Sequence, residues 1–219
     1  MKNVLPRAVI FDWDNTLVDS WGAIGEAVNH VRARYGKPVW PREEIPDRCT
    51  RSARDSFPEM FGDKWQEAMD AFYVHFRKAR ERDGIHPAEG AKDLLAWLLD
   101  NRIPAIVVSN KMGEHLRHEA THLGWDHYFA SIVGARDAIR DKPAREHADH
   151  ALSLAGLEAS PDIWFIGDGE SDVACARAIG CIPLLIGNQA TAQTLGVAHF
   201  FTGCREILEQ LNAIKSALP

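Results

Sequence analysis

The chain has 219 residues, a formal net charge of −6 and 46% hydrophobic residues, a composition typical of a folded globular protein. This length can hold one large hydrophobic core together with a small second domain. The acidic balance, without any block of basic residues, argues against a nucleic acid as a partner. No apolar run is as long as a membrane span and no signal peptide precedes the first expected strand, so we expect a cytoplasmic protein that needs no membrane.

The first predicted strand covers residues 8–11, an uninterrupted apolar run typical of a strand that is buried on both faces of a parallel sheet. Asp12 follows directly, and Asp14 comes after one further residue. Two carboxylates at the end of a buried strand oppose each other's ionisation, and a divalent cation, a shared proton or a basic partner is the usual remedy. We therefore expect a cation near Asp12 and Asp14, although a capped strand-to-helix turn would show the same residues.

The next segment, residues 17–86, has apolar residues at helical spacing and no strand pattern. Helices are predicted over residues 21–35, 41–57 and 62–82. A helical insertion of this length directly after the first strand indicates a separate domain. We expect an α/β core formed by residues 1–16 and 87–219, with a small all-α domain at residues 17–86.

From residue 88 onward, predicted strands and helices alternate. Further strands are expected at residues 103–108, 131–133, 163–166, 182–186 and 199–201, and helices at residues 91–99, 112–123, 143–155, 173–179 and 205–217. This alternation predicts βαβ units and a Rossmann-like parallel sheet. Right-handed crossovers place the carboxyl ends of all parallel strands at one edge, where open α/β sheets bind their ligands.

Polar residues that suit phosphate or metal chemistry stand beside these strand ends. They are Asp12 and Asp14, Ser109 and Asn110, Lys142 at the start of a helix, and Asp168 and Asp172. If a helix begins near Glu170, Asp172 lies in its first turn. Four of these residues also have simpler interpretations. Ser109 could cap a helix, and Lys142 could be solvated. Asp168 could only form a turn, and Asp172 could only complement the helix dipole.

The segment from Asp12 to Ser20, Asp-Trp-Asp-Asn-Thr-Leu-Val-Asp-Ser, resembles the first motif of the haloacid dehalogenase superfamily. Ser109-Asn110, Lys142-Pro143 and the segment from Asp168 to Asp172 resemble its second, third and fourth motifs, in that order. The dehalogenase branch lacks a second aspartate, so Asp14 points to the phosphohydrolases that make up most of the superfamily. The chain is similar to the phosphoglycolate phosphatase branch, which implies a helical cap inserted after the first motif.

The resemblance also implies a role for each matched residue. Asp12 would be the nucleophile, and Asp14 would be the general acid and base. A Mg²⁺ ion would be held by Asp12, the backbone carbonyl of Asp14, Asp168 and, through a water, Asp172. The phosphoryl oxygens would be bound by Ser109, the Asn110 backbone N–H and Lys142. We therefore expect an enzyme that hydrolyses a small phosphorylated metabolite through an aspartyl-phosphate.

Two other activities stay open at this point. A phosphomutase of the same fold would keep the phosphoryl group on the aspartate and transfer it to a sugar phosphate. A phospho-acceptor signalling domain would form an aspartyl-phosphate without hydrolytic turnover, but the insertion at residues 17–86 and the second aspartate, Asp14, argue against it.

Two groups of basic residues lie outside the motifs. Arg48, Arg51 and Arg54 are three apart in the helical segment and could either form a solvated face or read a second anionic group of the substrate, with Arg51 as the candidate. His115, His118 and His122 also recur at helical spacing. They could bind a metal, although a half-exposed helix face explains the same pattern.

Overall fold

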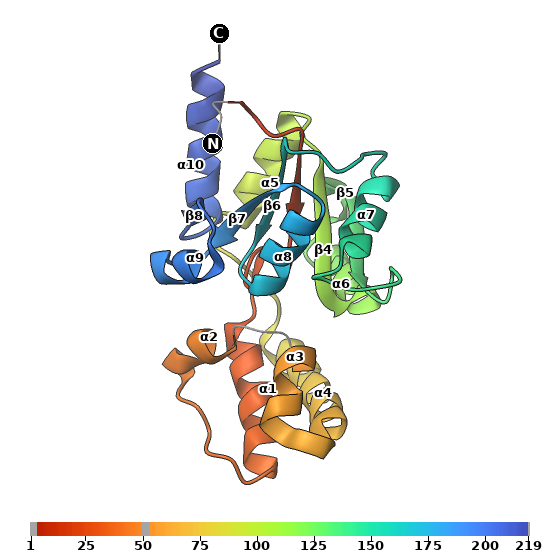
Figure 1. Cartoon of the computed structure of the whole chain (residues 1–219), viewed down its shortest axis with the longest axis vertical. Coiled ribbons are helices and arrows are strands. Elements are labelled where there is room, and N and C mark those ends of the chain that lie inside the picture. The colour runs from red at the N-terminus through yellow and green to blue at the C-terminus, as the bar shows by residue number, and fades with distance from the viewer. Residues whose placement is uncertain (1–3, 50–52, 219) are drawn as a thin grey trace. The chain divides into compact units, whose positions relative to one another are not determined.

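The computed structural model describes residues 4–49 and 53–218, and the chain divides into two compact units. The first unit is an α/β unit formed by Met1–Val18 and Pro87–Pro219, and the second is a helical unit formed by Asp19–His86. Figure 1 shows both units along the chain. Within the described residues, none of the helices combines the length and apolarity that a membrane crossing needs.

The α/β unit is built on a six-stranded sheet in which neighbouring strands are parallel. Its strands are β1 (Ala8–Phe11), β4 (Ala105–Met112), β5 (Phe129–Ala135), β6 (Ile163–Gly167), β7 (Ile182–Ile186) and β8 (Phe200–Phe201), in the spatial order β5-β4-β1-β6-β7-β8. The fully buried β1 lies between β4 and β6. Strands β4 and β5 lie on one side of β1, and the later strands β6, β7 and β8 lie on the other. The strand order therefore reverses at β1, and open α/β sheets bind ligands at the carboxyl end of the strands at such a switch point.

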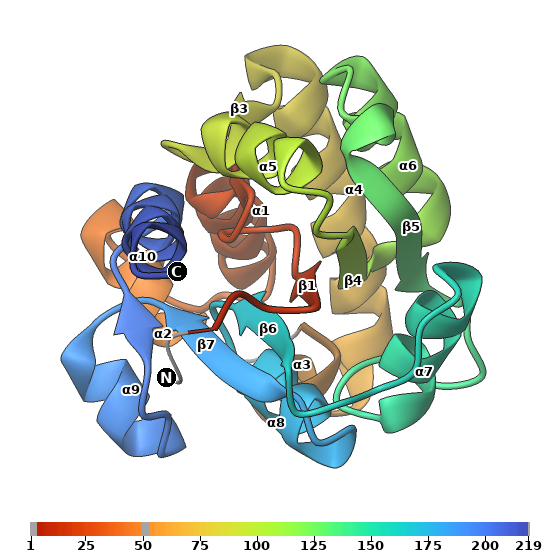
Figure 2. The same cartoon turned by 90° about the horizontal axis from the view of Figure 1, so that it is seen from above.

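Helices cover both faces of this sheet (Figure 2). They are α5 (Ala91–Asp100), α6 (Gly113–His122), α7 (Arg145–Leu154), α8 (Glu170–Ala178), α9 (Gln189–Leu195) and α10 (Cys204–Ser216). Helices α5 and α10 pack together on one face, whereas α7 and α8 lie on the opposite face. Ala8 and Ile10 of β1 join a buried cluster with Ala148 of α7 and Cys175 of α8. A strand covered on both sides needs apolar residues at every position, which explains the uninterrupted run of β1.

The helical unit has its own aromatic core. Its helices are α1 (Trp21–Arg34), α2 (Ile45–Arg48), α3 (Ala53–Phe61) and α4 (Trp65–Asp83). Phe57 of α3 contacts Phe61 at a ring-centroid distance of 4.9 Å and Phe72 of α4 at 5.5 Å, both edge-on. Val28 and Val31 of α1 are buried against this group. Aromatic pairs of this geometry add to the free energy gained from burial alone.

The prediction of one helix over residues 41–57 is wrong. The chain instead forms a 3-10 turn at Arg42–Glu44, the short α2, and then α3, which contains Pro58 in its interior. Pro46 lies in the first turn of α2, where its missing N–H costs nothing. Pro58 is tolerated because the buried rings of its neighbours Phe57 and Phe61 hold α3 against the core.

Three short elements also differ from the sequence-based prediction. Strands β2 (Val18–Asp19) and β3 (His86–Pro87) pair with each other where no strand was expected, because two residues are too few to show a period. Helix α9 was not predicted because it lacks an apolar stripe. Its end signals are nevertheless present, since the Asn188 side chain accepts a hydrogen bond from the Thr191 N–H and Gly196 ends the helix at a positive φ of 61°.

Candidate active site

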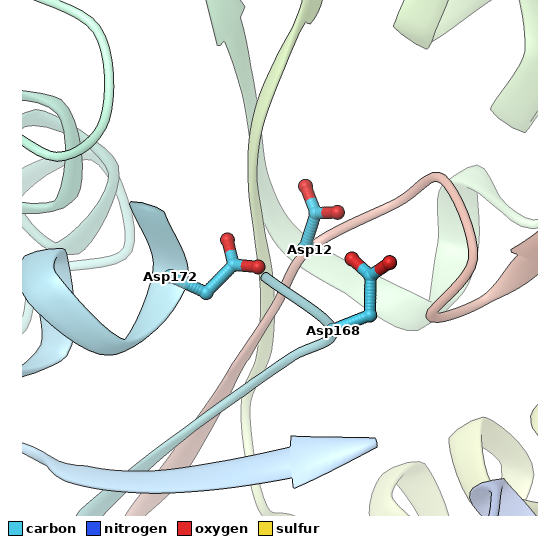
Figure 3. Close-up of side chains that lie close together, drawn as sticks. All are labelled: Asp12, Asp168 and Asp172. Carbon is cyan, nitrogen blue, oxygen red and sulfur yellow. The ribbon is translucent and has the colours of Figure 1, made fainter. Parts of the chain in front are cut away.

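Three carboxylates meet at the carboxyl end of β1 and β6 (Figure 3). Asp12 follows β1, Asp168 follows β6, and Asp172 lies in the first turn of α8. Ligand oxygens of these three residues lie within 4.8 Å of one another. The parallel pairing of Phe11 with Ile166 brings the first two together, because it places the ends of both strands at the same level.

Asp172 reaches this group because α8 begins at Glu170, three residues before the predicted start at residue 173, so that Asp172 lies in its first turn. The helix starts at Glu170, and the Gly169 N–H donates a hydrogen bond of 3.0 Å to Asp172 Oδ2. Gly167, the last residue of β6, has no side chain at the point where the Asp172 carboxyl group passes, and a Cβ there would collide with it. The glycine before Asp168 is therefore required by the close approach of Asp172.

Lys142 joins two of the carboxylates. Its Nζ donates hydrogen bonds of 2.6 Å to Asp12 Oδ1 and to Asp172 Oδ1, and only 1% of its side chain is exposed. Burial raises the pKa of Asp12 to about 6, although the neighbouring Lys142 opposes this shift. Burial alone would lower the pKa of Lys142, but the charges of Asp12 and Asp172 raise it above its usual value. Lys142 is therefore a fixed positive charge, and its interpretation as a solvated lysine is wrong.

The remaining negative charge makes the group suitable for a divalent cation. Burial and the charges of Asp12 and Asp172 raise the pKa of Asp168 well above its usual value. Three carboxylates share one ammonium group, so two negative charges are left uncompensated when all are ionised. Carboxylate oxygens are the ligands that Mg²⁺ prefers, so these residues fit that ion. We call Asp12, Lys142, Asp168 and Asp172 the Asp12 cluster.

A buried histidine holds the backbone of Lys142. The Lys142 N–H donates a hydrogen bond of 3.0 Å to Nδ1 of His147 on α7, and His147 Nε2 lies 3.0 Å from the Gly134 carbonyl oxygen. Because Nδ1 accepts, the proton is on Nε2, which donates to that carbonyl. Burial lowers the pKa of His147, which favours this neutral form. No motif or spacing in the sequence indicates this role, because His147 lies in an ordinary amphipathic helix.

Ser109 and Asn110 lie in β4, which continues through Met112 before α6 begins. Ser109 is buried, and its Oγ accepts a hydrogen bond of 3.3 Å from the Lys111 N–H. Asn110 Nδ2 donates to the Lys142 carbonyl oxygen at 3.1 Å. The interpretation of Ser109 as a helix cap is wrong, since Met112 is the residue at the N-cap. Asn110 thus adjoins the Asp12 cluster through Lys142, whereas the contact of Ser109 is with Lys111.

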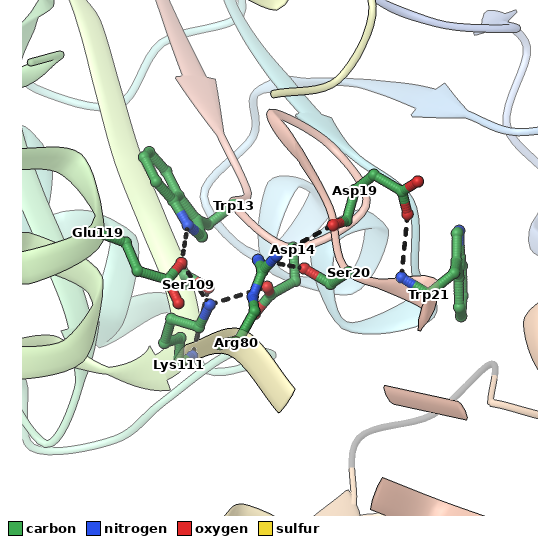
Figure 4. A network of polar contacts seen from close by, with 9 residues as sticks. All are labelled: Trp13, Asp14, Asp19, Ser20, Trp21, Arg80, Ser109, Lys111 and Glu119. Carbon is green, nitrogen blue, oxygen red and sulfur yellow. Dashed lines mark hydrogen bonds and ion pairs between the residues drawn. The ribbon is translucent and has the colours of Figure 1, made fainter. Parts of the chain in front are cut away.

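Asp14 belongs to a second group of polar contacts, drawn in Figure 4. Lys111 Nζ donates to Asp14 Oδ1 at 2.9 Å and to Oε2 of Glu119, on α6, at 2.7 Å. The indole N–H of Trp13 donates to the same Glu119 oxygen at 2.7 Å. We call Trp13, Asp14, Lys111 and Glu119 the Asp14 cluster. Lys111 and Glu119 were not among the site residues predicted from the sequence. The signal that could have identified Glu119 is its place as an acid on the apolar side of α6.

The other candidates lie apart from these clusters. Arg51 lies outside the described residues, as does the side chain of Arg54. Arg48 Nε forms an exposed ion pair with Glu44 Oε2 at 2.7 Å. The three histidines of α6, His115, His118 and His122, are exposed. Among the described residues, the group suited to a metal is the one formed by Asp12, Asp168 and Asp172.

The fold and the site define a parallel α/β protein with an acidic centre at its switch point. The sequence pattern of the haloacid dehalogenase-like hydrolases matches residues 9–186, which is most of the chain. The chain belongs to this family and is therefore an enzyme. This membership confirms the resemblance seen in the motifs, and with it the predicted class of a parallel α/β core with a small all-α domain.

Individual relatives span nearly the whole chain. A phosphoglycolate phosphatase of Chromobacterium violaceum is 29% identical over 201 residues, which cover 87% of this chain and 89% of the relative. Phosphoglycolate phosphatase 1 of Pseudomonas aeruginosa is 28% identical and covers 84% of this chain and 71% of its own. Among solved structures, a haloacid dehalogenase-superfamily hydrolase of Ehrlichia chaffeensis is 30% identical, with a TM-score of 0.67 and 97% of both chains covered. A hydrolase of Streptococcus pneumoniae, 24% identical, has a TM-score of 0.79 over 95% of this chain and 99% of its own, which shows the shared fold.

Proposed function

We propose that this enzyme is a Mg²⁺-dependent phosphomonoesterase that acts on a small phosphorylated metabolite through an aspartyl-phosphate on Asp12. The observation that carries the proposal is the Asp12 cluster, in which a buried lysine and two further carboxylates surround Asp12. Relatives named phosphoglycolate phosphatase make 2-phosphoglycolate the first substrate to test.

The chain's own residues supply a metal site that fits this chemistry. Asp12, Asp168, Asp172 and the backbone carbonyl of Asp14 would hold the ion. When bound, Mg²⁺ offsets the negative charge of both the phosphate and the nucleophile. Lys142 contributes a further positive charge beside Asp12. It thereby stabilises Asp12 as the carboxylate that attack requires.

The reaction would proceed in two balanced steps. In the first, an Asp12 carboxylate oxygen forms a bond to phosphorus while the bond from phosphorus to the leaving oxygen breaks, and Asp14 gives that oxygen its proton. In the second, Asp14 takes a proton from water, and the water oxygen forms a bond to phosphorus while the bond from phosphorus to the Asp12 oxygen breaks. This step releases orthophosphate and restores the Asp12 carboxylate. Ser109 Oγ and the Asn110 N–H would donate hydrogen bonds to the phosphoryl oxygens in both steps.

The helical unit would serve as the cap that sets substrate specificity. Its core is separate from that of the α/β unit, so it can vary without disturbing the catalytic residues. Arg51 stays our candidate for reading a second anionic group of the substrate. The Arg51→Ala variant is expected to raise the KM for 2-phosphoglycolate more than that for p-nitrophenyl phosphate.

Phosphate release from a panel of metabolite phosphates, measured with Mg²⁺ and with EDTA, tests the proposal. We expect release from at least one alkyl phosphate, its loss with EDTA and its return with Mg²⁺. Hydrolysis that persists after complete metal removal would contradict the mechanism. Isomerisation of a hexose 1-phosphate without phosphate release would identify a phosphomutase. A stable aspartyl-phosphate without turnover would identify a phospho-acceptor.

A further inference from the structure

We propose that Lys111 and Glu119 are positioning residues that hold the carboxylate of Asp14 for proton transfer to and from the reacting oxygens. The inference rests on the proposed phosphatase function, because it needs Asp14 to be the acid and base. It assigns a purpose to two charged residues that the motifs leave unexplained. The residues lie on different elements, Lys111 at the end of β4 and Glu119 on α6.

Lys111 is placed to hold Asp14 in one orientation. Its ammonium group contacts Asp14 Oδ1 at 2.9 Å and Glu119 Oε2 at 2.7 Å, and its side chain is only 6% exposed. A flexible lysine that contacted Asp14 alone would lose much of its hold through rotamer freedom. The second contact, with Glu119, fixes the ammonium group independently of Asp14. One oxygen of the Asp14 carboxylate is therefore held from a rigid point.

Glu119 is itself held by the segment that carries the catalytic aspartates. The Trp13 indole N–H and the Lys111 ammonium group both donate to the same oxygen, Oε2. Trp13 stands between Asp12 and Asp14 in the sequence, and its fully buried ring packs edge-on against Trp125 at a centroid distance of 5.9 Å. Through these contacts, α6 fixes both the backbone beside Asp14 and the lysine that holds its side chain.

The geometry favours positioning over a direct contact between Lys111 and the substrate. A lysine that binds a substrate anion keeps its ammonium group available, whereas Lys111 contacts two carboxylates and is almost wholly buried. Glu119 adds a negative charge at this place, which would weaken the binding of an anion. The buried Glu119 carboxylate is instead suited to anchoring Lys111 and Trp13, which both donate hydrogen bonds to it.

The substitutions at Glu119 separate geometry from charge. Because both donors use one oxygen, Glu119→Gln can keep both hydrogen bonds through its amide oxygen while it loses the charge. Glu119→Met removes both bonds at a similar volume, and Lys111→Met removes the contact with Asp14. Arg117→Met is the matched control, because Arg117 is a neighbouring cation on α6 that pairs with Asp137 at 2.5 Å, outside the Asp14 cluster.

The test compares a poor leaving group with a good one. We expect Lys111→Met and Glu119→Met to slow turnover of an alkyl phosphate by about tenfold to a hundredfold. The initial burst of nitrophenolate from p-nitrophenyl phosphate should change by less than about threefold, because this leaving group hardly needs a proton. Glu119→Gln and Arg117→Met should stay within about threefold of the wild type on both substrates. Beryllium fluoride should raise the Tm of all four variants as it raises that of the wild type, which shows that the Asp12 cluster is intact.

Several outcomes would overturn the inference. Equal losses on both substrates for Lys111→Met would show a general structural or electrostatic effect. A loss in Glu119→Gln as large as in Glu119→Met would show that charge, not orientation, is what Glu119 provides. A rise in KM limited to substrates with a second anionic group would make Lys111 a substrate ligand. If the wild type hydrolyses no phosphate ester, the proposed function fails and this inference fails with it, whereas the other outcomes leave the function intact.

Discussion

Two clusters at the same sheet edge use the same arrangement, a buried lysine between two carboxylates, with different surroundings. Lys142 lies between Asp12 and Asp172, and Lys111 lies between Asp14 and Glu119. The first cluster has a third carboxylate, Asp168, which leaves excess negative charge that a divalent cation can offset. The second has a neutral donor in that place, the Trp13 indole N–H, which donates to Glu119 Oε2 at 2.7 Å.

Because their surroundings differ, two aspartates only two residues apart can have different tasks. Asp12 is buried next to the excess charge, where a metal ion and a phosphoryl group would gather. Asp14 is half-buried and faces a lysine whose charge Glu119 already shares. Nucleophilic attack requires a carboxylate beside positive charge, whereas acid–base catalysis requires a carboxyl group in a fixed orientation. The two surroundings match these two requirements.

The largest effect is expected from Asp12, the proposed nucleophile. Asp12→Asn removes the attacking oxygen but keeps the side-chain volume, and turnover should fall by at least about ten-thousandfold on every substrate. Phosphate release with Mg²⁺ measures this loss, and beryllium fluoride should no longer raise the Tm. The same variant should raise the Tm of the metal-free protein, because it removes one of three clustered negative charges. Normal turnover in Asp12→Asn would rule out covalent catalysis at this residue.

Asp14→Asn should give the next largest effect and the sharpest contrast with Asp12→Asn. Hydrolysis of an alkyl phosphate should slow by about a hundredfold to ten-thousandfold, because an alkoxide leaving group needs a proton. With p-nitrophenyl phosphate, the aspartyl-phosphate should still form quickly and then break down slowly, since no base activates the water. Rapid mixing should therefore show a burst of nitrophenolate. An equal loss on both substrates without a burst would remove Asp14 from proton transfer.

Protons should compete with the metal at the Asp12 cluster. The pKa of Asp12 is raised to about 6 and that of Asp168 well above its usual value, so both carboxyl groups hold protons more readily than exposed aspartates do. Mg²⁺ must displace those protons, and its Kd should rise as the pH falls below about 6, by up to about tenfold per pH unit for each proton. Titration calorimetry in two buffers of different ionisation enthalpy would detect the released protons. Asp168→Asn should bind Mg²⁺ weakly at every pH, and an unchanged Kd would show that Asp168 is no ligand.

The residues of the Asp12 cluster could be predicted because each follows a local rule. A buried strand that ends in an acid, or a Gly-Asp segment that opens a helix, can be read within about ten residues of sequence, and parallel topology then brings the ends together. Glu119, Lys111 and His147 follow no such rule. Trp13 and Glu119 are 106 residues apart, and a buried acid on a helix looks in sequence like one more surface charge. Their partners are set by packing, which only the folded structure shows.

The difference between local sequence rules and packing also explains why the helix predicted over residues 41–57 of the helical unit is wrong. Pro58 predicted the end of a helix, because a proline lacks the N–H that a helix interior needs. The structure continues α3 to Phe61, since the aromatic contacts of Phe57 with Phe61 and Phe72 outweigh the lost hydrogen bond. Local propensity sets where helices and strands tend to begin and end. Where this propensity conflicts with the burial of apolar side chains, burial decides the structure.

The smallest effect concerns His147, which supports the Asp12 cluster from behind. His147→Asn can keep an acceptor for the Lys142 N–H, because Asn Oδ1 lies close to the position of His Nδ1, but it loses the bond to the Gly134 carbonyl. At pH 7.5 this should lower the free energy of unfolding by about 1–3 kcal/mol. The loss of free energy of unfolding caused by His147→Asn should be smaller at lower pH. Burial lowers the pKa of His147 in the folded protein, so below about pH 6.5 the unfolded wild type binds a proton that the folded protein does not, and the wild type loses stability.

The difference between wild type and His147→Asn should therefore fall by about 1 kcal/mol between pH 7.5 and 5.5. Urea unfolding at the two pH values measures it, and subtraction removes the contribution of the carboxylates, which are the same in both proteins. His150→Asn, at an exposed position of the same helix, is the control for the loss of a histidine from α7, and its free energy of unfolding is measured at the same two pH values. A pH-independent difference for His147→Asn would mean that His147 is not held neutral, and the Lys142 backbone would then need another anchor. Turnover with Mg²⁺ should change little, since Lys142 keeps both of its carboxylate partners.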